Sequence, residues 1–284
     1  MSGVLFPMQT VRTSRNYILI LLALVVTVAL SVSLGLVIRS GSVSLPSTIG
    51  DTIIPALAEP PSSLLSKPEI ESLRSAYARH YDMGNGRRVA VVGASPLNYQ
   101  KADGSWEPYR PEFQPTETGW SVSHNSLRSK FASSNTAVQL VVEETGIDWQ
   151  PLALEINTDG DIARPLAVPM TGDVAKGQAT ERALQYHDAW SDPSIVERFR
   201  SRAGSLKQEL VLAAAPAATS AGQWLSLRVD LAIPAGVQVL ANGSAQTAGF
   251  TTAGSLELQQ ADGTTVLTFI PPRAYELEDR SEYV

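Results

Sequence analysis

One segment near the N-terminus constrains the fold more than any other feature. Residues 17–38 read YILILLALVVTVALSVSLGLVI, a run of 22 residues without a charge. A helix rises about 1.5 Å per residue, so this run spans the roughly 30 Å hydrocarbon core of a bilayer. A buried helix of a soluble domain would show a polar stripe, and only Thr27, Ser31 and Ser33 interrupt the apolar residues. The segment therefore predicts a transmembrane helix in contact with the lipid bilayer.

The distribution of charge predicts the orientation of that helix. Residues 1–50 contain Arg12, Arg15 and Arg39 and no acid, whereas residues 51–284 carry all 28 acidic residues and a net charge of −9. Basic flanks stay on the cytoplasmic side, so we expect residues 1–16 to form a cytoplasmic stub and the C-terminal domain to lie outside. The total charge of −6 also argues against nucleic acid as a partner, because phosphate contacts need a basic surface.

The sequence offers two fates for the anchor. The tripeptide Ala56-Leu57-Ala58 matches the small-residue site that signal peptidase cuts. It lies far beyond Arg39 for such a site, so a retained, single-pass anchor is the favoured interpretation. The alternative is a secreted protein, cleaved after Ala58.

Two further features precede the main domain. Residues 39–67 are rich in Ser, Pro and Gly and predict a spacer that holds a folded domain away from the membrane. A short helix is then predicted over about 67–80, because Ser66 and Glu69 form a capping box and apolar residues recur on one face (Ile70, Leu73 and Tyr77).

The chain from residue 68 to residue 284 predicts a β-rich domain. From residue 225 to residue 233 every odd position is apolar, the pattern of a half-buried strand. Further strands are expected at 87–92, 136–142, 151–157 and 207–213. Turn dipeptides recur between them (Asn85-Gly86, Asp103-Gly104, Asp159-Gly160, Asn242-Gly243 and Asp262-Gly263). We therefore predict a mainly β fold, an antiparallel β-sandwich made of one large domain or two packed subdomains, with residues 213–222 as a loop between them.

One hairpin can be predicted residue by residue. A two-residue turn at Asp262-Gly263 would place Leu258 opposite Leu267 and Leu256 opposite Phe269, with all four side chains on one face. The other face would pair Glu257 with Thr268 and Gln259 with Val266. The hydrophobic pattern and the turn select the same register.

A series of motifs resembles a known family. The motifs are Glu71 and Arg74, Tyr81-Asp82-x-Gly84-x-Gly86, Pro96-Leu97-Asn98-Tyr99-Gln100, Asp103-Gly104-x-Trp106-x-Pro108, Tyr186-x-x-Ala189-Trp190, residues 204–212 and residues 256–274. Their order is similar to that in the N-terminal β-rich module of bacterial Rhs/YD-repeat and wall-associated surface proteins. The resemblance implies a secreted or surface-displayed module without catalytic residues of its own. The long apolar segment at the start departs from that family's plan.

Motifs that carry chemistry are absent from the sequence. Without cysteine there is no disulfide, thiolate zinc site or cysteine nucleophile. No G-x-S-x-G, phosphate-binding or HExxH pattern occurs, and His80, His124 and His187 are widely spaced. We therefore assign no catalytic, cofactor-binding or metal-binding residue, expect no cofactor, and do not expect an enzyme.

Two acidic patterns allow a weaker functional interpretation. Asn157, Asp159 and Asp161 occupy the first positions of a calcium-loop pattern, but the glycine and the last ligand are misplaced, so a hairpin turn is favoured. Glu143, Glu144 and Asp148 could join Asp159 and Asp161 in a glycosidase carboxylate pair. Exposed strand edges explain the same acids.

The five tryptophans allow two interpretations. They are Trp106, Trp120, Trp149, Trp190 and Trp224. A stacking platform for sugars is one, and filling of the core is the favoured one. Trp106 belongs to a family-like motif and is expected to be structural, whereas Trp120 is expected to be the most exposed.

The sequence thus predicts a membrane-anchored, extracytoplasmic β-sandwich module at the bacterial cell surface, with a structural or interaction role. Its expected partners are the bilayer and a cell-wall or surface protein. The alternative is a carbohydrate-binding or cell-wall-directed hydrolase domain. Exposed aromatic residues would favour sugar binding, and two converging carboxylates with a raised pKa would favour hydrolysis.

Overall fold

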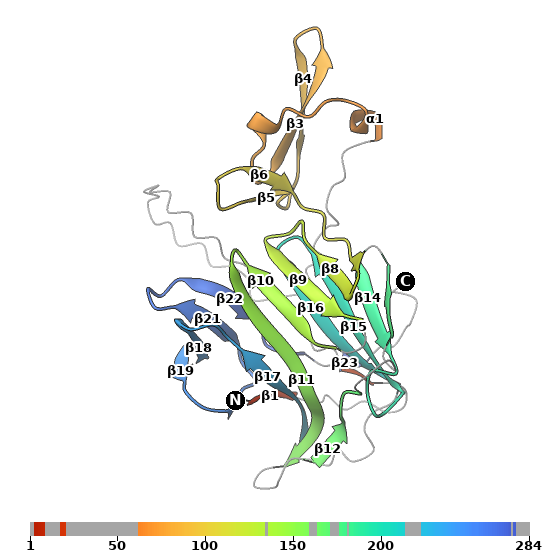
Figure 1. Ribbon diagram of the computed structural model, residues 1–284, viewed down its shortest axis with the longest axis vertical. Helices are drawn as coiled ribbons and strands as arrows, with labels where there is room; N and C mark the ends of the chain where they lie inside the picture. Colours follow the sequence, from red (N-terminus) through yellow and green to blue (C-terminus); the bar gives the residue numbers. More distant parts are fainter. Residues whose placement is uncertain are drawn as a thin grey trace. The chain divides into compact units, whose positions relative to one another are not determined.

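The computed structural model describes residues 3–8, 18–20, 62–133, 136–158, 164–170, 176–180, 182–213, 223–273 and 275–276. These residues are mainly β and form two compact units, a small unit of residues 62–107 and a large unit from Pro108 onward (Figure 1). The large unit also includes the strands among the first 20 residues. The division lies between Glu107 and Pro108 rather than at the predicted loop, of which residues 214–222 lie outside the described residues.

The small unit consists of short elements. They are α1 (Ser62–Leu65), the 3-10 helix η1 (Glu71–Leu73), β3 (Ala78–Gly84), β4 (Arg87–Val92), β5 (Asn98–Gln100) and β6 (Trp106–Pro108). Strands β3 and β4 form an antiparallel hairpin, and β5 pairs with β6. Asn85 and Gly86 make the hairpin turn with φ angles of 53° and 73°, the positive values expected for an Asn-Gly turn.

The helix predicted over about 67–80 is wrong. Only Glu71–Leu73 is helical there, and β3 already begins at Ala78. The Ile70 amide donates to the His80 carbonyl at 2.7 Å, so the chain pairs with β3 instead of coiling. Pairing between segments that are separate in sequence outweighs the local helix signals.

The residues that predicted a helix in that region either make other contacts or remain exposed. The Glu69 carboxylate binds the Arg74 guanidinium instead of capping a helix at Ser66. Leu73 and Tyr77, on the expected apolar face, remain 38% and 50% exposed. A narrow apolar stripe without a surface to pack on does not stabilise a helix.

The strands of the large unit form three sheets within the described residues. A nine-stranded sheet has the order β20-β1-β17-β11-β10-β9-β8-β7, with β12 beside β11. Its strands are β1 (Gly3–Met8), β7 (Gln114–Thr116), β8 (Gly119–Val122), β9 (Leu127–Ala132), β10 (Val138–Val142), β11 (Thr145–Thr158), β12 (Arg164–Ala167), β17 (Gln223–Ala232) and β20 (Phe250–Thr251). All of its pairings are antiparallel except that of β1 with β20.

The other two sheets are smaller and antiparallel. The six-stranded sheet contains β13 (Lys176–Ala179), β14 (Ala183–His187), β15 (Ile195–Arg202), β16 (Ser205–Leu212), β2 (Ile18–Ile20) and β23 (Tyr275–Glu276), in that order. The four-stranded sheet has the order β19 (Ser244–Gln246), β18 (Val237–Ala241), β21 (Leu256–Gln260) and β22 (Thr265–Phe269). The strands expected at 87–92, 136–142, 151–157, 207–213 and 225–233 all occur as β4, β10, β11, β16 and β17.

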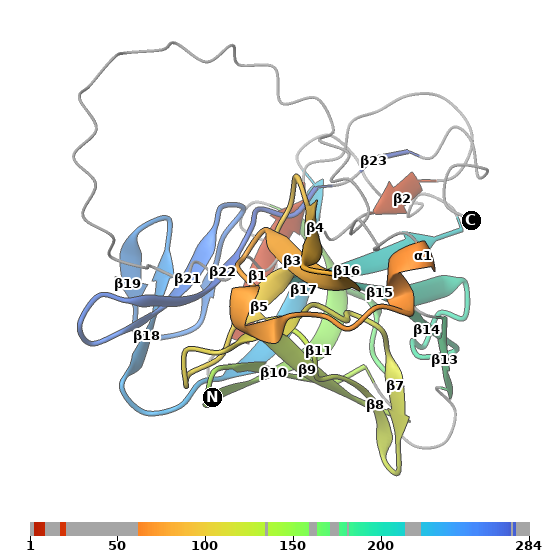
Figure 2. The same cartoon turned by 90° about the horizontal axis from the view of Figure 1, so that it is seen from above.

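One hydrophobic core joins the three sheets, whose arrangement is drawn in Figures 1 and 2. Phe131 of β9 lies 5.0 Å from Phe199 of β15, measured between ring centroids, and Trp149 of β11 stacks on Phe269 of β22 at 5.2 Å. The six-stranded and four-stranded sheets therefore both pack against the nine-stranded sheet. Apolar burial on this scale is the main favourable term for a fold with few helices.

The Asn125 side chain links the nine-stranded sheet to a turn of the six-stranded sheet. Asn125, 1% exposed, donates to the Arg202 carbonyl at 2.8 Å and accepts from the Gly204 amide at 2.7 Å. These bonds tie the β15–β16 turn to the connection between β8 and β9. Near the same layer boundary, the Tyr186 hydroxyl donates to the Ala132 carbonyl at 2.6 Å.

The predicted transmembrane helix is not seen in the described residues. Residues 18–20 form β2, which pairs with β16 and β23, and the other residues of 17–38 lie outside the described part. Among the described residues no helix is long and apolar enough to cross a membrane. The linker predicted at 39–67 is described only from Ser62, where α1 begins. The membrane anchor stays a prediction from the sequence.

The β21–β22 hairpin has the predicted register with one difference. Leu256 pairs with Phe269, Leu258 pairs with Leu267, and all four side chains are 0% exposed. The turn, however, is longer than predicted, because a bulge after Leu258 pairs Gln259 with residue 265 instead of residue 266. Gly263 has φ 86°, typical of the glycine that ends a three-residue hairpin loop.

This packing predicts the cost of truncating Leu256. Leu256→Ala should lower the free energy of unfolding by roughly 2–5 kcal/mol, because it removes buried methyl groups and leaves a cavity beside Phe269. Urea denaturation measures the loss. Glu257→Ala, on the opposite face of the same strand, is the matched control and should change stability by less than about 1 kcal/mol. Equal losses for the two variants would contradict the register.

Candidate functional site

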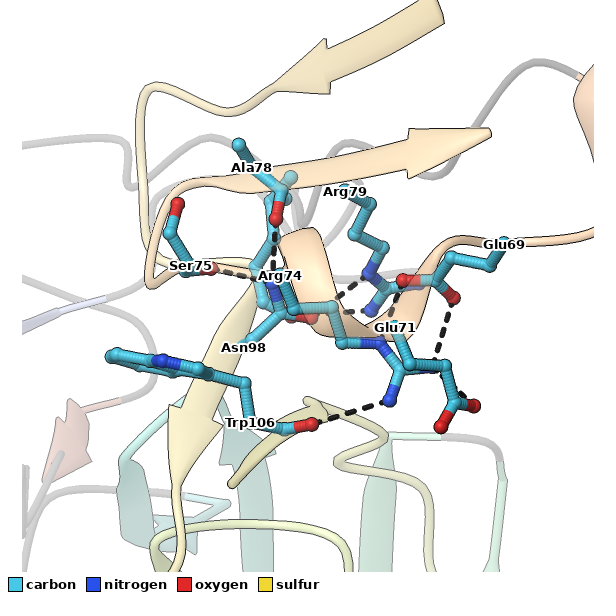
Figure 3. A network of polar contacts seen from close by, with 9 residues as sticks. Glu69, Glu71, Arg74, Ser75, Ala78, Arg79, Asn98 and Trp106 are labelled. Carbon is cyan, nitrogen blue, oxygen red and sulfur yellow. Dashed lines mark hydrogen bonds and ion pairs between the residues drawn. The ribbon is translucent and has the colours of Figure 1, made fainter. Parts of the chain in front are cut away.

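The small unit contains a network of polar contacts around one arginine (Figure 3). The Arg74 guanidinium donates to both oxygens of the Glu69 carboxylate, at 2.7 and 3.0 Å, and to Glu71 at 3.1 Å. It also donates to the Trp106 carbonyl at 3.2 Å. One side chain thereby connects η1, the residues before it and β6.

A buried asparagine completes this network. Asn98, 1% exposed, donates from Nδ2 to the carbonyls of Ser75 and Ala78, at 2.6 and 3.1 Å, and its Oδ1 accepts from Arg79 Nε at 3.1 Å. Arg79 also donates to the Leu97 carbonyl. The amide therefore adds side-chain hydrogen bonds to the carbonyls of the Ser75–Ala78 turn and holds this turn against β5.

Residues of the family-like motifs make most of these contacts. Glu71, Arg74, Asn98 and Trp106 all belong to the motifs of the resemblance. Arg74, Asn98 and Trp106 each bond to another segment of the small unit, and Glu71 bonds to Arg74. Tyr99, from the same motif, donates to Glu107 at 2.6 Å. The motif therefore encodes the internal packing of a small unit that has few apolar residues to bury.

In the large unit, β15 carries a buried carboxylate. Glu197 is 0% exposed on the core face, where it accepts from Trp190 Nε1 at 3.0 Å and from Gln208 Nε2. Burial raises the pKa of Glu197 to about 7, because the low dielectric disfavours the charged form more than these hydrogen bonds favour it.

A second buried carboxylate lies on the opposite face of the same strand pair. Glu209 of β16 is 0% exposed and binds Nε of Arg198 and Nε of Arg200, the latter at 3.2 Å, while Lys207 Nζ lies 3.0 Å away. Burial acts to raise the pKa of Glu209, but the three cations outweigh it and the net shift is downward. Glu209 is therefore a fixed anion among cations.

The two carboxylates do not form a catalytic pair. Glu197 pairs in register with Leu210, and Glu209 with Arg198, so the alternation of side chains places them on different faces. Glu197 has the raised pKa expected of a general acid, but it is surrounded by the core and a substrate does not reach it. The arrangement is suited to fixing the strand pairing.

An open hollow of about 500 Å³ lies where three turns of the large unit meet. It is lined by residues 144–146 of the β10–β11 turn, residues 234–237 before and at the start of β18, and residues 260–262 of the β21–β22 turn. Asp262 accepts from the Thr264 amide at 2.9 Å, and this bond lowers the pKa of Asp262. The hollow could hold a polar ligand, but its Asp262 carboxylate is not a proton donor.

The acids singled out in the sequence have structural positions. Glu143, with φ 52°, and Glu144 form the exposed turn between β10 and β11. Asp148 is exposed on β11 and accepts from Gln139 Nε2 at 3.1 Å. Asn157 donates to Ser226 Oγ, and the rest of the calcium-like pattern, residues 159–161, lies outside the described residues.

The histidines do not come together in the part of the chain that is described. His80 lies in β3 of the small unit, whereas His124 and His187 are exposed in the large unit. Within the same residues no three His, Asp or Glu side chains form a group that could hold a metal ion.

Two of the five tryptophans lie in the core. Trp149 and Trp190 are 1% and 2% exposed, and Trp106, Trp120 and Trp224 are partly buried. Trp120, expected to be the most exposed, is partly buried and packs against the core. The interpretation as core residues holds for Trp149 and Trp190.

No protein-family model, curated protein or solved structure matches this chain. The resemblance to surface proteins therefore remains a prediction based on the motifs.

The raised pKa of Glu197 predicts how stability depends on pH. The folded chain binds this proton up to about pH 7, whereas the unfolded chain releases it near the ordinary value of 4.5. Stability should therefore fall as pH rises through this window and then level off. Glu197→Gln should remove this part of the fall and be more stable than the parent at pH 8 by up to roughly 3 kcal/mol.

Urea denaturation at pH 5 and pH 8 tests this effect. The exposed Glu144→Gln is the matched control and should keep the parent's difference between the two pH values. A Glu197→Gln variant with an unchanged pH profile would contradict the assignment of the buried proton.

The contacts of Asn98 predict a second effect. Asn98→Ala should destabilise the small unit by about 2–3 kcal/mol, because it removes three hydrogen bonds made by a side chain that is 1% exposed. The measurement is amide hydrogen exchange in β3 and β4, which should become faster. Gln100→Ala, which removes only an exposed bond to Gly104, should leave these rates nearly unchanged. Equal protection in both variants would show that Asn98 does not hold the unit together.

Proposed function

We propose that this chain is a membrane-anchored, extracytoplasmic β-sandwich module with a structural or interaction role at the bacterial cell surface. The observation that carries the proposal is the uncharged run of residues 17–38 with arginines before it and an acidic β-rich region after it. This order matches a cytoplasmic start, a bilayer-spanning helix and an exported domain. In that arrangement β1 and β2 do not pair with β17 and β16 of the exported domain as they do in the fold described above. The alternative fate, secretion after cleavage following Ala58, keeps the same exported domain.

The use of polar residues supports a structural or interaction role. Arg74, Asn98 and Asn125 each bond to backbone groups of other segments. Glu197 is enclosed by the core, and Glu209 by three cations. In the described residues these polar side chains hold elements together.

The carbohydrate-binding and hydrolase alternative has less support. A platform for sugars would need tryptophans on the surface, and Trp149 and Trp190 are buried in the core. A hydrolase would need an accessible acid with a raised pKa, and Glu197 is enclosed. We therefore favour recognition by surfaces and strand edges over chemistry in a cleft.

The proposed topology can be tested by cysteine labelling, because the chain has no cysteine of its own. Spheroplasts expressing the full chain are treated with a membrane-impermeant maleimide. Val168→Cys, at a position 41% exposed in the large unit, should be labelled in intact spheroplasts. Ser2→Cys should be labelled only after lysis.

Labelling of Ser2→Cys from outside, or protection of Val168→Cys until lysis, would overturn the topology. N-terminal sequencing of the exported product distinguishes a retained anchor from cleavage after Ala58. Both products keep residue 168 outside.

A further inference from the structure

The β3–β4 hairpin of the small unit is protected along one edge only. Beside β3, the Asp82 amide donates to the Pro68 carbonyl at 2.9 Å, and the Ile70 amide donates to the His80 carbonyl. Along β4, among the described residues, the only paired strand is β3 (Figure 1). The outer backbone groups of β4 are therefore a template for another strand.

The side chains of β4 do not protect this edge. Residues 89–92 read Val-Ala-Val-Val, with Val89 36% and Val92 70% exposed. Tyr77, whose carbonyl accepts from the Gly93 amide at the end of β4, is 50% exposed. Exposed edges usually carry a proline, a bulge or a central charge, and β4 has its only charges at its start, in Arg87 and Arg88. An apolar edge of this kind marks an interaction surface.

The sequence of β4 is complementary to itself. An antiparallel pair of identical strands with a two-fold axis has one residue opposite its own copy. With Ala90 on the axis, Val89 faces Val91 of the second copy, and Arg88 faces Val92 of the second copy. The valines are then covered, and the arginines of the two chains lie at opposite ends of the pair.

We propose that β4 binds a second copy of the chain through this register. The two hairpins then form one four-stranded sheet with the order β3-β4-β4-β3. The second copy fits this edge better than an acidic peptide does, because the central residues of β4 are apolar and only its first two are charged. Under the proposed function both copies share one bilayer, which raises their local concentration; this last point alone rests on the proposed function.

Single cysteines test the register, again because the chain has none of its own. Val89→Cys, Ala90→Cys and Val91→Cys are made in the full chain, purified in detergent and mildly oxidised. Ala90→Cys should give the highest yield of disulfide-linked dimer on a non-reducing gel, because only residue 90 faces its own copy. Val168→Cys, exposed in the large unit, is the matched control and should stay monomeric.

Charged residues introduced at position 92 test the register, because lysine and aspartate should change the dimer yield in opposite directions. In the proposed register this position faces Arg88 of the second copy. In the Ala90→Cys background, Val92→Lys should lower the dimer yield and Val92→Asp should raise it, each by roughly two- to fivefold, the effect of a cross-strand charge pair. Both are substitutions at an exposed position, so the hairpin itself should persist.

Three outcomes would overturn the inference. The first is that none of the three cysteine variants forms a disulfide-linked dimer. The second is that Ala90→Cys yields no more dimer than Val168→Cys does. The third is that lysine and aspartate at position 92 change the dimer yield in the same direction. These measurements use purified protein and do not depend on topology. Failure of the proposed self-pairing is therefore separable from failure of the membrane orientation, which the maleimide labelling reports.

Discussion

The large unit depends on aromatic contacts across its layers. Phe131 against Phe199 joins the nine-stranded sheet to the six-stranded sheet, and Trp149 against Phe269 joins it to the four-stranded sheet. Without these contacts each sheet would expose one apolar face to water. Hydrophobic contacts alone do not determine how two layers are aligned. The hydrogen bonds of Asn125 and Tyr186 do, because they fix which backbone groups of the two layers meet.

Buried charge plays a related part in strands β15 and β16. Glu197 on the core face and Glu209 on the other face each bind side chains of the neighbouring strand. If β15 shifted by one residue along β16, Glu197 would leave the core face, and Arg198 and Arg200 would turn away from Glu209 toward that face. The carboxylates therefore cost solvation energy and contribute specificity of strand pairing.

The positions of the strands could be predicted from the sequence better than the long-range contacts around them. Alternation and turn residues located β4, β10, β11, β16 and β17, and they placed Leu256 opposite Phe269, because both signals act between near neighbours. The helix at 67–80 failed because Ile70 pairs with His80, a contact that local propensity does not include. Glu197 was missed as well. It stands between Ile195 and Phe199 on an alternating strand, and this position alone indicated a buried carboxylate, but its partners Trp190 and Gln208 are known only from the fold.

Strand β11, the long green strand of Figure 1, has a consequence for the order in which the chain can fold. It pairs along much of its length with β17, which begins 65 residues after β11 ends. A ribosome or an export channel delivers the N-terminal side first. Strands β7 to β11 therefore emerge with one side of β11 still unpaired, and they must wait for β17 before the sheet can close. Contacts so distant along the chain fold slowly, so this module should need protection from aggregation during its own synthesis more than after it.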